Sequence, residues 1–276
     1  MRLSPVALLS REAEVHRTHC GDGSLVWRRW GSGPPLVLLH GGSGSWMHWV
    51  KTIPALREDY SVWVVDLPGL GDSAMPPDPH TPATCAAVVA EGFRQLFTAG
   101  PPVTMICFSF GCHVGTLVAA ELNDHLSSLF IIGSAALGLG RAESISLPKE
   151  RSGMDEDARL AVHRNVLANL MFASAENIDD TAVEVQVHNI ANARFRSREF
   201  ADTADVRDGL ARISVPVKSI WGSRDVVAHP DIESCLDALR LHHPELQYRI
   251  IEDAGHWVMY EAADEFNGAL RELLST

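Results

Sequence analysis

Short apolar runs of strand length recur along the chain and indicate a sheet. Residues 24–30 alternate between apolar and polar side chains, as an edge strand does. The other runs are continuously apolar, which is typical of strands buried on both faces of a parallel sheet. The pattern therefore predicts central parallel strands at residues 35–40, 61–66, 103–108, 129–133, 217–222 and 246–251.

Helical patterns fill the spaces between these runs. Residues 81–99 begin with a threonine before Pro82 and end before a glycine and two prolines, which are favourable start and stop signals for a helix. Residues 110–122 and 261–274 carry apolar side chains at helical spacing. Because strand and helix alternate, the sequence predicts an α/β fold with a mostly parallel sheet and helices on both sides.

One long stretch interrupts this alternation. Between about residues 136 and 208 no run has the pattern of a strand, whereas residues 155–173 and 180–194 have the pattern of amphipathic helices. We therefore divide the chain into a core of residues 1–135 and 209–276 and a helical insertion of residues 136–208. The insertion separates two strands of the predicted sheet.

The charge of the chain narrows the classes of partner. The formal net charge is −12 over 276 residues, which argues against nucleic acid or an anionic membrane surface as the main partner. A small anionic substrate stays compatible, because one nearby arginine outweighs a distant field. We expect a small-molecule substrate, and a homodimer is left open.

Cysteine usage and the absence of targeting signals favour a cytoplasmic protein. The five cysteines are scattered and odd in number, which is simplest to explain by free thiols in a reducing compartment. The apolar run within residues 1–10 is too short for a signal peptide, and no run approaches the ~18 apolar residues of a membrane span. The sequence has no H-E-x-x-H motif, and we expect no metal and no cofactor.

Ser109 is the candidate nucleophile. It directly follows the apolar run of residues 103–108 and directly precedes a predicted helix, which is the setting of a nucleophile elbow. The tight turn needs small residues two positions before and after the serine, and Cys107 and Gly111 meet that need. The Phe110 N–H at the start of the helix can then stabilise an oxyanion. A serine that merely caps a helix is the alternative.

A glycine-rich loop, HGGSGSW at residues 40–46, follows another buried strand. Glycines let the backbone turn sharply and present its N–H groups, so we take Gly42 as the second oxyanion donor. A phosphate-binding loop is the rival interpretation. It lacks support, because the sequence has no G-K-[ST] and the third glycine of a dinucleotide fingerprint is absent at Met47. We interpret His40 as a structural residue that holds the loop backbone.

Asp225 and His256 are the candidate acid and base. Each follows an apolar run of the predicted sheet, so both should lie at the edge of the sheet that carries Ser109. The order Ser, Asp, His along the chain is the one expected for this kind of site. A serine hydroxyl needs a base to take its proton, and a buried carboxylate fixes the tautomer of that base. We interpret Asp253, close to His256 in sequence, as a loop residue.

Taken together, these segments resemble the α/β-hydrolase family. The matching pieces are HGGSGSW at 40–46, DLPGLGDS at 66–73, CFSFGC at 107–112, WGSRD at 221–225 and AGHW at 254–257. The resemblance implies an eight-stranded sheet with a helical cap over the active site. It also implies a triad of Ser109, Asp225 and His256, with Gly42 and Phe110 as the oxyanion hole, and a structural turn after Asp66.

The departures from the family pattern bear on packing and on substrate. Cys107 and Cys112 replace commoner glycines around the elbow. A serine nucleophile speaks against epoxide hydrolases and haloalkane dehalogenases, which use aspartate at this position. Trp46 and the Gly-His-Trp sequence ending at Trp257 are similar to the carbon–carbon hydrolases of aromatic breakdown. The G-P-G-A loop usual in that group is absent here.

Three residues are candidate substrate contacts. The subgroup resemblance points to Trp46 and Trp257. Arg196 lies in the most polar stretch of the insertion, and an arginine aimed at the pocket could bind a substrate carboxylate in a bidentate manner. The alternative is that the arginines of this stretch cover the cap surface and pair with acids.

We therefore predict a serine hydrolase that cleaves an ester or an activated carbon–carbon bond in a small organic substrate. Two alternatives stay open at this point. One is a cofactor-free haloperoxidase or lyase that uses the same triad. The other is a receptor that binds a small ligand in the cap pocket without turnover.

Overall fold

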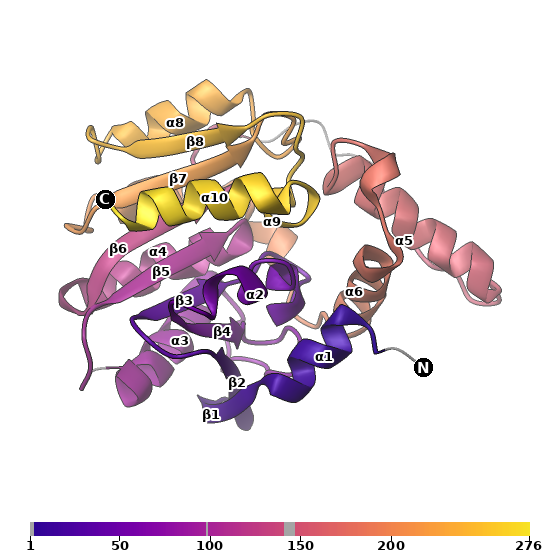
Figure 1. Ribbon diagram of the computed structural model, residues 1–276, viewed down its shortest axis with the longest axis horizontal. Coiled ribbons are helices and arrows are strands. Elements are labelled where there is room, and N and C mark those ends of the chain that lie inside the picture. The colour runs from indigo at the N-terminus through magenta and orange to yellow at the C-terminus, as the bar shows by residue number, and fades with distance from the viewer. Residues whose placement is uncertain (1–2, 98, 141–146) are drawn as a thin grey trace.

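One eight-stranded sheet forms the centre of the molecule (Figure 1). The computed structural model describes residues 3–97, 99–140 and 147–276. The strand order is β1-β2-β4-β3-β5-β6-β7-β8; β1 and β4 each pair antiparallel with β2, and all other neighbours are parallel. This confirms the predicted mostly parallel sheet. The strands are β1 (Glu14–Cys20), β2 (Gly23–Trp30), β3 (Pro35–Leu39), β4 (Ser61–Asp66), β5 (Val103–Phe108), β6 (Leu126–Ile132), β7 (Val217–Gly222) and β8 (Gln247–Ile251).

The first strand and the helix before it have no counterpart in the predicted elements. β1 is the outer edge strand, and most of its residues are exposed or only partly buried. Its sequence, EVHRTHC, is therefore polar, and it lacks the apolar signal that marks the central strands. The preceding helix α1 (Pro5–Glu12) buries only Val6 and Leu9, with Ser4 as its N-cap.

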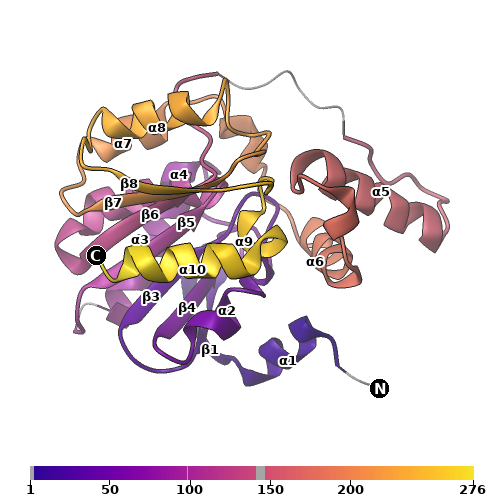
Figure 2. The ribbon, with the colours of Figure 1, turned by 45° about the horizontal axis from the view of Figure 1, so that its top comes forward.

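Helices cover both faces of the sheet and enclose two separate apolar cores (Figure 2). One core lies under α3 (Pro82–Phe97), α4 (Phe110–Leu122), α7 (Asp205–Leu210) and α8 (Ile232–Arg240). The other lies under α1, α2 (Ile53–Leu56), α9 (Val258–Glu261) and α10 (Ala263–Leu274). Burial on both faces explains why the central strands have continuous apolar sequences rather than alternating ones.

The predicted insertion contains two helices that extend away from the sheet, α5 (Glu156–Leu170) and α6 (Asp180–Ala191) (Figure 1). Its two ends come together, since the N–H groups of Ala136 and Gly138 donate to the carbonyls of Ala201 and Thr203 at 3.0 Å. The proposed boundary at residue 208 falls inside α7, which packs against α4 of the core. Residues 1–2, 98 and 141–146 of the predicted segments lie outside the described residues.

Short 3₁₀ helices complete the chain at η1 (Trp46–Trp49), η2 (Asn123–His125), η3 (Ala175–Asn177) and η4 (Ser197–Phe200). Across the described ranges, no helix combines the length and apolarity needed to cross a bilayer.

Candidate active site

Ser109 occupies a strained turn between β5 and α4. Its backbone φ is +51°, a left-handed conformation that a non-glycine residue rarely adopts. The turn is held because the Ser109 N–H donates to the Ile132 carbonyl at 2.9 Å. Gly111 is required, since a Cβ there would come within 2.6 Å of the Leu39 carbonyl oxygen. The backbone therefore has the sharp strand-to-helix geometry that the sequence predicts for an elbow.

Cys107 fits the elbow because Gly115, one helical turn after Gly111 in α4, leaves room for its side chain. A Cβ at Gly115 would lie 2.2 Å from the Cys107 sulfur. Cys112 is also accommodated, with its thiol directed at the carbonyls of Cys107 and Ile132 at 3.1 and 3.4 Å. The departures from glycine at these two positions are thus absorbed in the packing.

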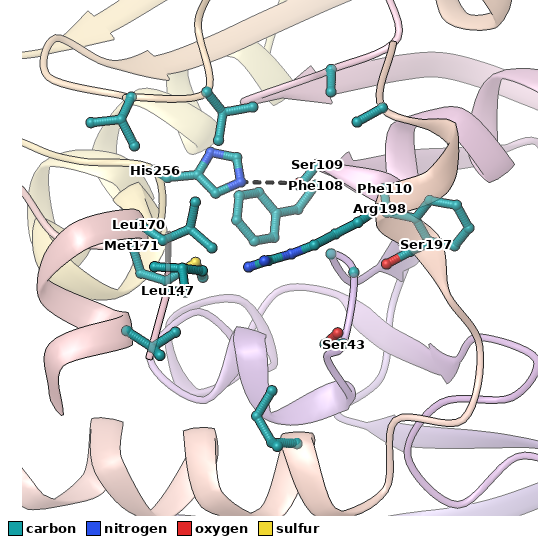
Figure 3. Close-up of a pocket in the computed structure, with 18 of the residues that line it drawn as sticks. Ser43, Phe108, Ser109, Phe110, Leu147, Leu170, Met171, Ser197, Arg198 and His256 are labelled. Atoms are coloured by element: carbon teal, nitrogen blue, oxygen red, sulfur yellow. Dashed lines mark hydrogen bonds between the residues drawn. The ribbon is translucent and has the colours of Figure 1, made fainter. Parts of the chain in front are cut away.

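The three side chains predicted as a triad lie in one hydrogen-bonded line (Figure 3 shows the Ser109–His256 bond). His256 Nε2 is 3.0 Å from Ser109 Oγ, and His256 Nδ1 is 3.0 and 2.9 Å from the two carboxylate oxygens of Asp225. A carboxylate only accepts, so Nδ1 carries the hydrogen and Nε2 is free to accept from the hydroxyl. The Asp225 and His256 side chains are 1% and 4% exposed, which shields this line from water.

Two linked loops carry the acid and the base. The loop after β7 joins the loop after β8 through Ser223 N–H to the Ile251 carbonyl at 2.8 Å and Arg224 N–H to the Ala254 carbonyl at 2.9 Å. The Arg224 guanidinium pairs with Asp253 at 2.6 Å on the exposed side. Asp253 is therefore a loop residue, as predicted, and it supports the loops from outside.

The glycine loop lies against Ser109 from the other side. Gly42 and Phe110 both line the cavity that contains Ser109, where their N–H groups were predicted to act. A Cβ at Gly41 would meet the Phe108 ring at 2.9 Å and Ser109 Cβ at 3.2 Å, so the loop approaches the nucleophile at close range. The first N–H groups of a helix have no partner within the helix, which leaves Phe110 N–H available for a substrate oxygen.

His40 has the structural role that the sequence suggested. Its ring is fully buried; Nδ1 donates to the Gly41 carbonyl at 2.8 Å, and Nε2 accepts from Leu67 N–H at 2.9 Å. Burial lowers the pKa of His40, so the ring stays neutral and holds the glycine loop in place.

A cavity of about 960 Å³ opens above Ser109, between the sheet and the helical insertion of residues 136–208, which we call the cap. Its walls are largely apolar, with Leu139, Val162, Val166, Leu170, Met171 and Ile190 among the lining side chains. A space of this size accommodates a small organic substrate. No cluster of three metal-ligating side chains occurs within residues 3–97, 99–140 and 147–276.

Neither of the two tryptophans predicted as substrate contacts is among the described residues that line this cavity, so the structure does not support that prediction. Trp46 is 2% exposed; its backbone N–H donates to Asp66 Oδ1 at 2.7 Å, and its ring packs against Trp30 at 5.4 Å between ring centres. Trp257 is 1% exposed, and its indole N–H donates to the His48 carbonyl at 2.9 Å. Both tryptophans build the core beneath the site.

Arg196 is also misplaced by the sequence prediction. Its side chain is 84% exposed and pairs with Glu199 at 3.2 Å, and it is absent from the described cavity lining. The sequence predicted a helix to residue 194, just before Arg196, but α6 ends at Ala191. Arg196 directly precedes η4, with φ −91° and ψ 66°, and its neighbours Phe195 and Ser197 are buried while its own side chain faces solvent. Arg198 lines the cavity instead.

The cysteines are unsuited to act as nucleophiles. All five are free and buried, and Cys235 is the one that also lines the cavity among the described residues. Burial raises the pKa of Cys235 to about 11 and that of Cys112 to about 12, so both thiols stay protonated near neutral pH. Ser109, with His256 Nε2 at 3.0 Å from its hydroxyl, stays the candidate nucleophile.

The family model for the alpha/beta hydrolase fold matches residues 34–263. The chain belongs to the α/β-hydrolase fold family. The matched range includes the glycine loop, the elbow and both loops that carry the acid and the base.

Individual relatives of this α/β hydrolase carry different activities. The chain is 27% identical to a pimeloyl-(acyl-carrier protein) methyl ester esterase of Vibrio atlanticus strain LGP32, over 88% of this chain and 95% of that protein. It is 36% identical to a soluble epoxide hydrolase of Corynebacterium sp. strain C12, over 92% and 94%. The crystal structure of a bromoperoxidase from Bacillus anthracis has the same fold, with a TM-score of 0.76, 19% identity and coverage of 95% and 100%. The protein is a hydrolase.

Glu261 supports the site and was not singled out from the sequence. Its carboxylate accepts from Gly255 N–H and Ala173 N–H at 2.8 Å, and from Ser174 N–H and Asn177 Nδ2 at 3.0 Å. It therefore ties the loop that carries the base to the segment between α5 and α6. In the sequence it has only the appearance of an acid at the start of a helix, which is usually solvated.

Replacing Glu261 by glutamine is expected to lower the free energy of unfolding by roughly 1–3 kcal/mol, because the amide group would face backbone N–H donors that then lack an acceptor. Urea denaturation measures this change. Glu265→Gln is the matched control, since Glu265 is exposed in the first turn of α10. Equal stability of the two variants would show that these four hydrogen bonds contribute little.

Proposed function

We propose that this α/β hydrolase is a carboxylic ester hydrolase that acts through Ser109, His256 and Asp225. The observation that carries the proposal is the unbroken line of hydrogen bonds from Ser109 Oγ through His256 to Asp225, which ends in the cavity. This is the geometry that activates a serine hydroxyl for attack on a carbonyl carbon. A relative named as a methyl ester esterase supports ester cleavage as the reaction.

The proposed reaction has two steps. In the first step, His256 Nε2 takes the Ser109 proton, Ser109 Oγ attacks the carbonyl carbon, and the N–H groups of Gly42 and Phe110 stabilise the oxyanion. The alcohol leaves with the proton from His256, and an acyl group stays on Ser109. In the second step, His256 takes a proton from water, the hydroxide attacks the acyl carbon, and the acid is released as Ser109 regains its proton.

The serine makes epoxide opening a poor fit, although one relative is an epoxide hydrolase. A carboxylate that opens an epoxide forms an ester, which water can then hydrolyse. A serine oxygen that opens an epoxide would form an ether, which the same site cannot hydrolyse. Turnover through Ser109 therefore requires a substrate with an acyl carbon.

The test is pre-steady-state hydrolysis of short p-nitrophenyl esters, from acetate to hexanoate. We expect a burst of p-nitrophenolate close to one equivalent of enzyme wherever deacylation is slower than acylation, followed by steady turnover. Absence of release above a Ser109→Ala control for every ester would contradict the proposal. In that case, ligand-induced stabilisation without turnover would favour the receptor alternative. Formation of peracids would favour the haloperoxidase alternative, and cleavage of cyanohydrins would favour the lyase alternative.

A further inference from the structure

Arg198 extends into the cavity without a counter-charge. Figure 3 shows its side chain reaching from the segment that carries Ser197 toward the middle of the pocket that Ser109 and His256 line, with the guanidinium nitrogens leading. In the described part of the chain, it has no ion pair or hydrogen bond of its side chain. Other arginines of the cap differ: Arg159 pairs with Glu150 at 3.0 Å and Arg164 with Asp180 at 2.7 Å.

The segment that carries Arg198 is fixed to the core. The N–H groups of Arg194 and Phe195 donate to the Gly69 carbonyl at 2.9 and 3.1 Å, and the Arg194 guanidinium bonds to the carbonyl of Ser73 at 2.5 Å. The Phe195 ring packs against Phe110 at 5.4 Å between ring centres. The backbone that leads to Arg198 is therefore fixed to the core by hydrogen bonds and ring packing.

The backbone next to Arg198 also lies beside the glycine loop of residues 40–46. A Cβ at Gly42 would come within 2.3 Å of the hydroxyl of Ser197, the preceding residue, and Ser197 is buried. A group bound by Arg198 would thus sit in the same cavity as the acyl carbon attacked by Ser109.

The charges around the cavity do not neutralise this guanidinium. Glu150 is the one acid on the cavity wall among the described residues, and its oxygens are bound by Arg159 at 3.0 Å and by His163 at 2.6 Å. Burial lowers the pKa of Arg198, yet a guanidinium stays charged at neutral pH. Arg198 is exposed through the open cavity, and its guanidinium lines that cavity without a partner among the described residues. Such a cation favours binding of an anion, and a planar carboxylate matches its fork of donors.

We propose that Arg198 forms an anion subsite and that the natural substrate is an ester bearing a second, carboxylate group. This rests on the proposed function. The carboxylate binds Arg198, the ester carbonyl lies at Ser109, and the apolar walls of the cavity contact the carbon chain between them. The negative charge of the whole protein does not oppose this, because the cation lies inside the cavity.

A matched pair of substrates tests the subsite: the mono-p-nitrophenyl ester of adipic acid and p-nitrophenyl hexanoate, which have acyl chains of the same length. We expect the native enzyme to favour the adipate ester at least tenfold in kcat/KM. Arg198→Met should lower that ratio at least tenfold, mainly through KM. Arg196→Met, the control two residues away, should keep the native ratio.

A native ratio near one, or an equal loss on both esters in Arg198→Met, would overturn the subsite while Ser109-dependent turnover upholds the hydrolase. If neither ester is hydrolysed, the proposed function fails and the subsite is decided by binding. Adipate dianion should then raise the melting temperature of the native protein and of Arg196→Met but not of Arg198→Met. An equal rise in all three proteins would overturn the subsite.

Discussion

Replacing Ser109 by alanine is expected to lower kcat for ester hydrolysis by about 10⁵- to 10⁶-fold, which is the scale seen when a serine nucleophile is removed from such a site. The reason is chemical: no other hydroxyl is 3.0 Å from His256 Nε2 in the described residues, and the buried thiols of Cys112 and Cys235 stay protonated. The substitution removes one oxygen from a partly buried turn, so the fold should persist.

Stopped-flow and long-time assays of the same ester measure this loss. Ser134→Ala is the matched control, because Ser134 lines the same cavity while its hydroxyl donates to the Ala135 carbonyl at 2.7 Å. The control should retain turnover close to that of the native enzyme. A Ser109→Ala variant with the activity of the control would refute Ser109 as the nucleophile.

Replacing Asp225 by asparagine is expected to lower kcat by about 10³- to 10⁴-fold with little change in fold. Asp225 Oδ1 accepts from Val227 N–H at 2.8 Å, so the asparagine oxygen should take that position. The amide nitrogen would then face His256 Nδ1 and donate to it. His256 would then carry its hydrogen on Nε2. A protonated Nε2 cannot accept the Ser109 proton.

Asp253→Asn serves as the control for this substitution, because Asp253 lies in the adjoining loop and pairs with Arg224 on the exposed side. It should have nearly native kcat, since its carboxylate is 78% exposed and does not contact the imidazole. Measured kcat values that fall equally in both variants would indicate a general effect of the loops rather than a tautomer effect at His256.

The central elements were predictable because their sequences carry strong and local signals. The helix predicted at residues 110–122 has these bounds in the structure, and the strand at residues 103–108 does as well. The strand is a buried apolar run that ends at the Ser109 turn, and the helix begins at that turn, where Gly111 is required. The meeting of Ser109, Asp225 and His256 was predictable for a related reason, since parallel strands bring their carboxyl ends to one edge of the sheet.

Other features depend on contacts that the sequence does not display. Trp46 was predicted as a substrate contact, yet its backbone N–H donates to Asp66, which is fully buried and also pairs with Arg28 at 2.8 Å. Asp66 thus fixes the backbone at Trp46, and the indole packs against Trp30 in the core. Glu261 likewise acts through backbone groups of the cap, and no local pattern marks such a partner.

The sequence could not show which arginine of the cap lines the cavity. Helical spacing groups its polar residues correctly only while the helix lasts, and α6 ends five residues before Arg196. Which arginine lines the cavity depends on the path of the chain between the end of α6 and η4, which begins at Ser197. Two residues along the chain separate Arg196, which pairs with Glu199 outside the cavity, from Arg198, which lines it.

The most direct test of Ser109 as the nucleophile is covalent labelling with diethyl p-nitrophenyl phosphate, followed by peptide mapping by mass spectrometry. A serine activated by a neighbouring base attacks this phosphotriester and keeps the diethylphosphoryl group. We expect one adduct per chain, located on Ser109, with activity lost in proportion to labelling and no adduct in Ser109→Ala. Labelling of another residue, or full activity in a protein labelled at Ser109, would contradict this assignment.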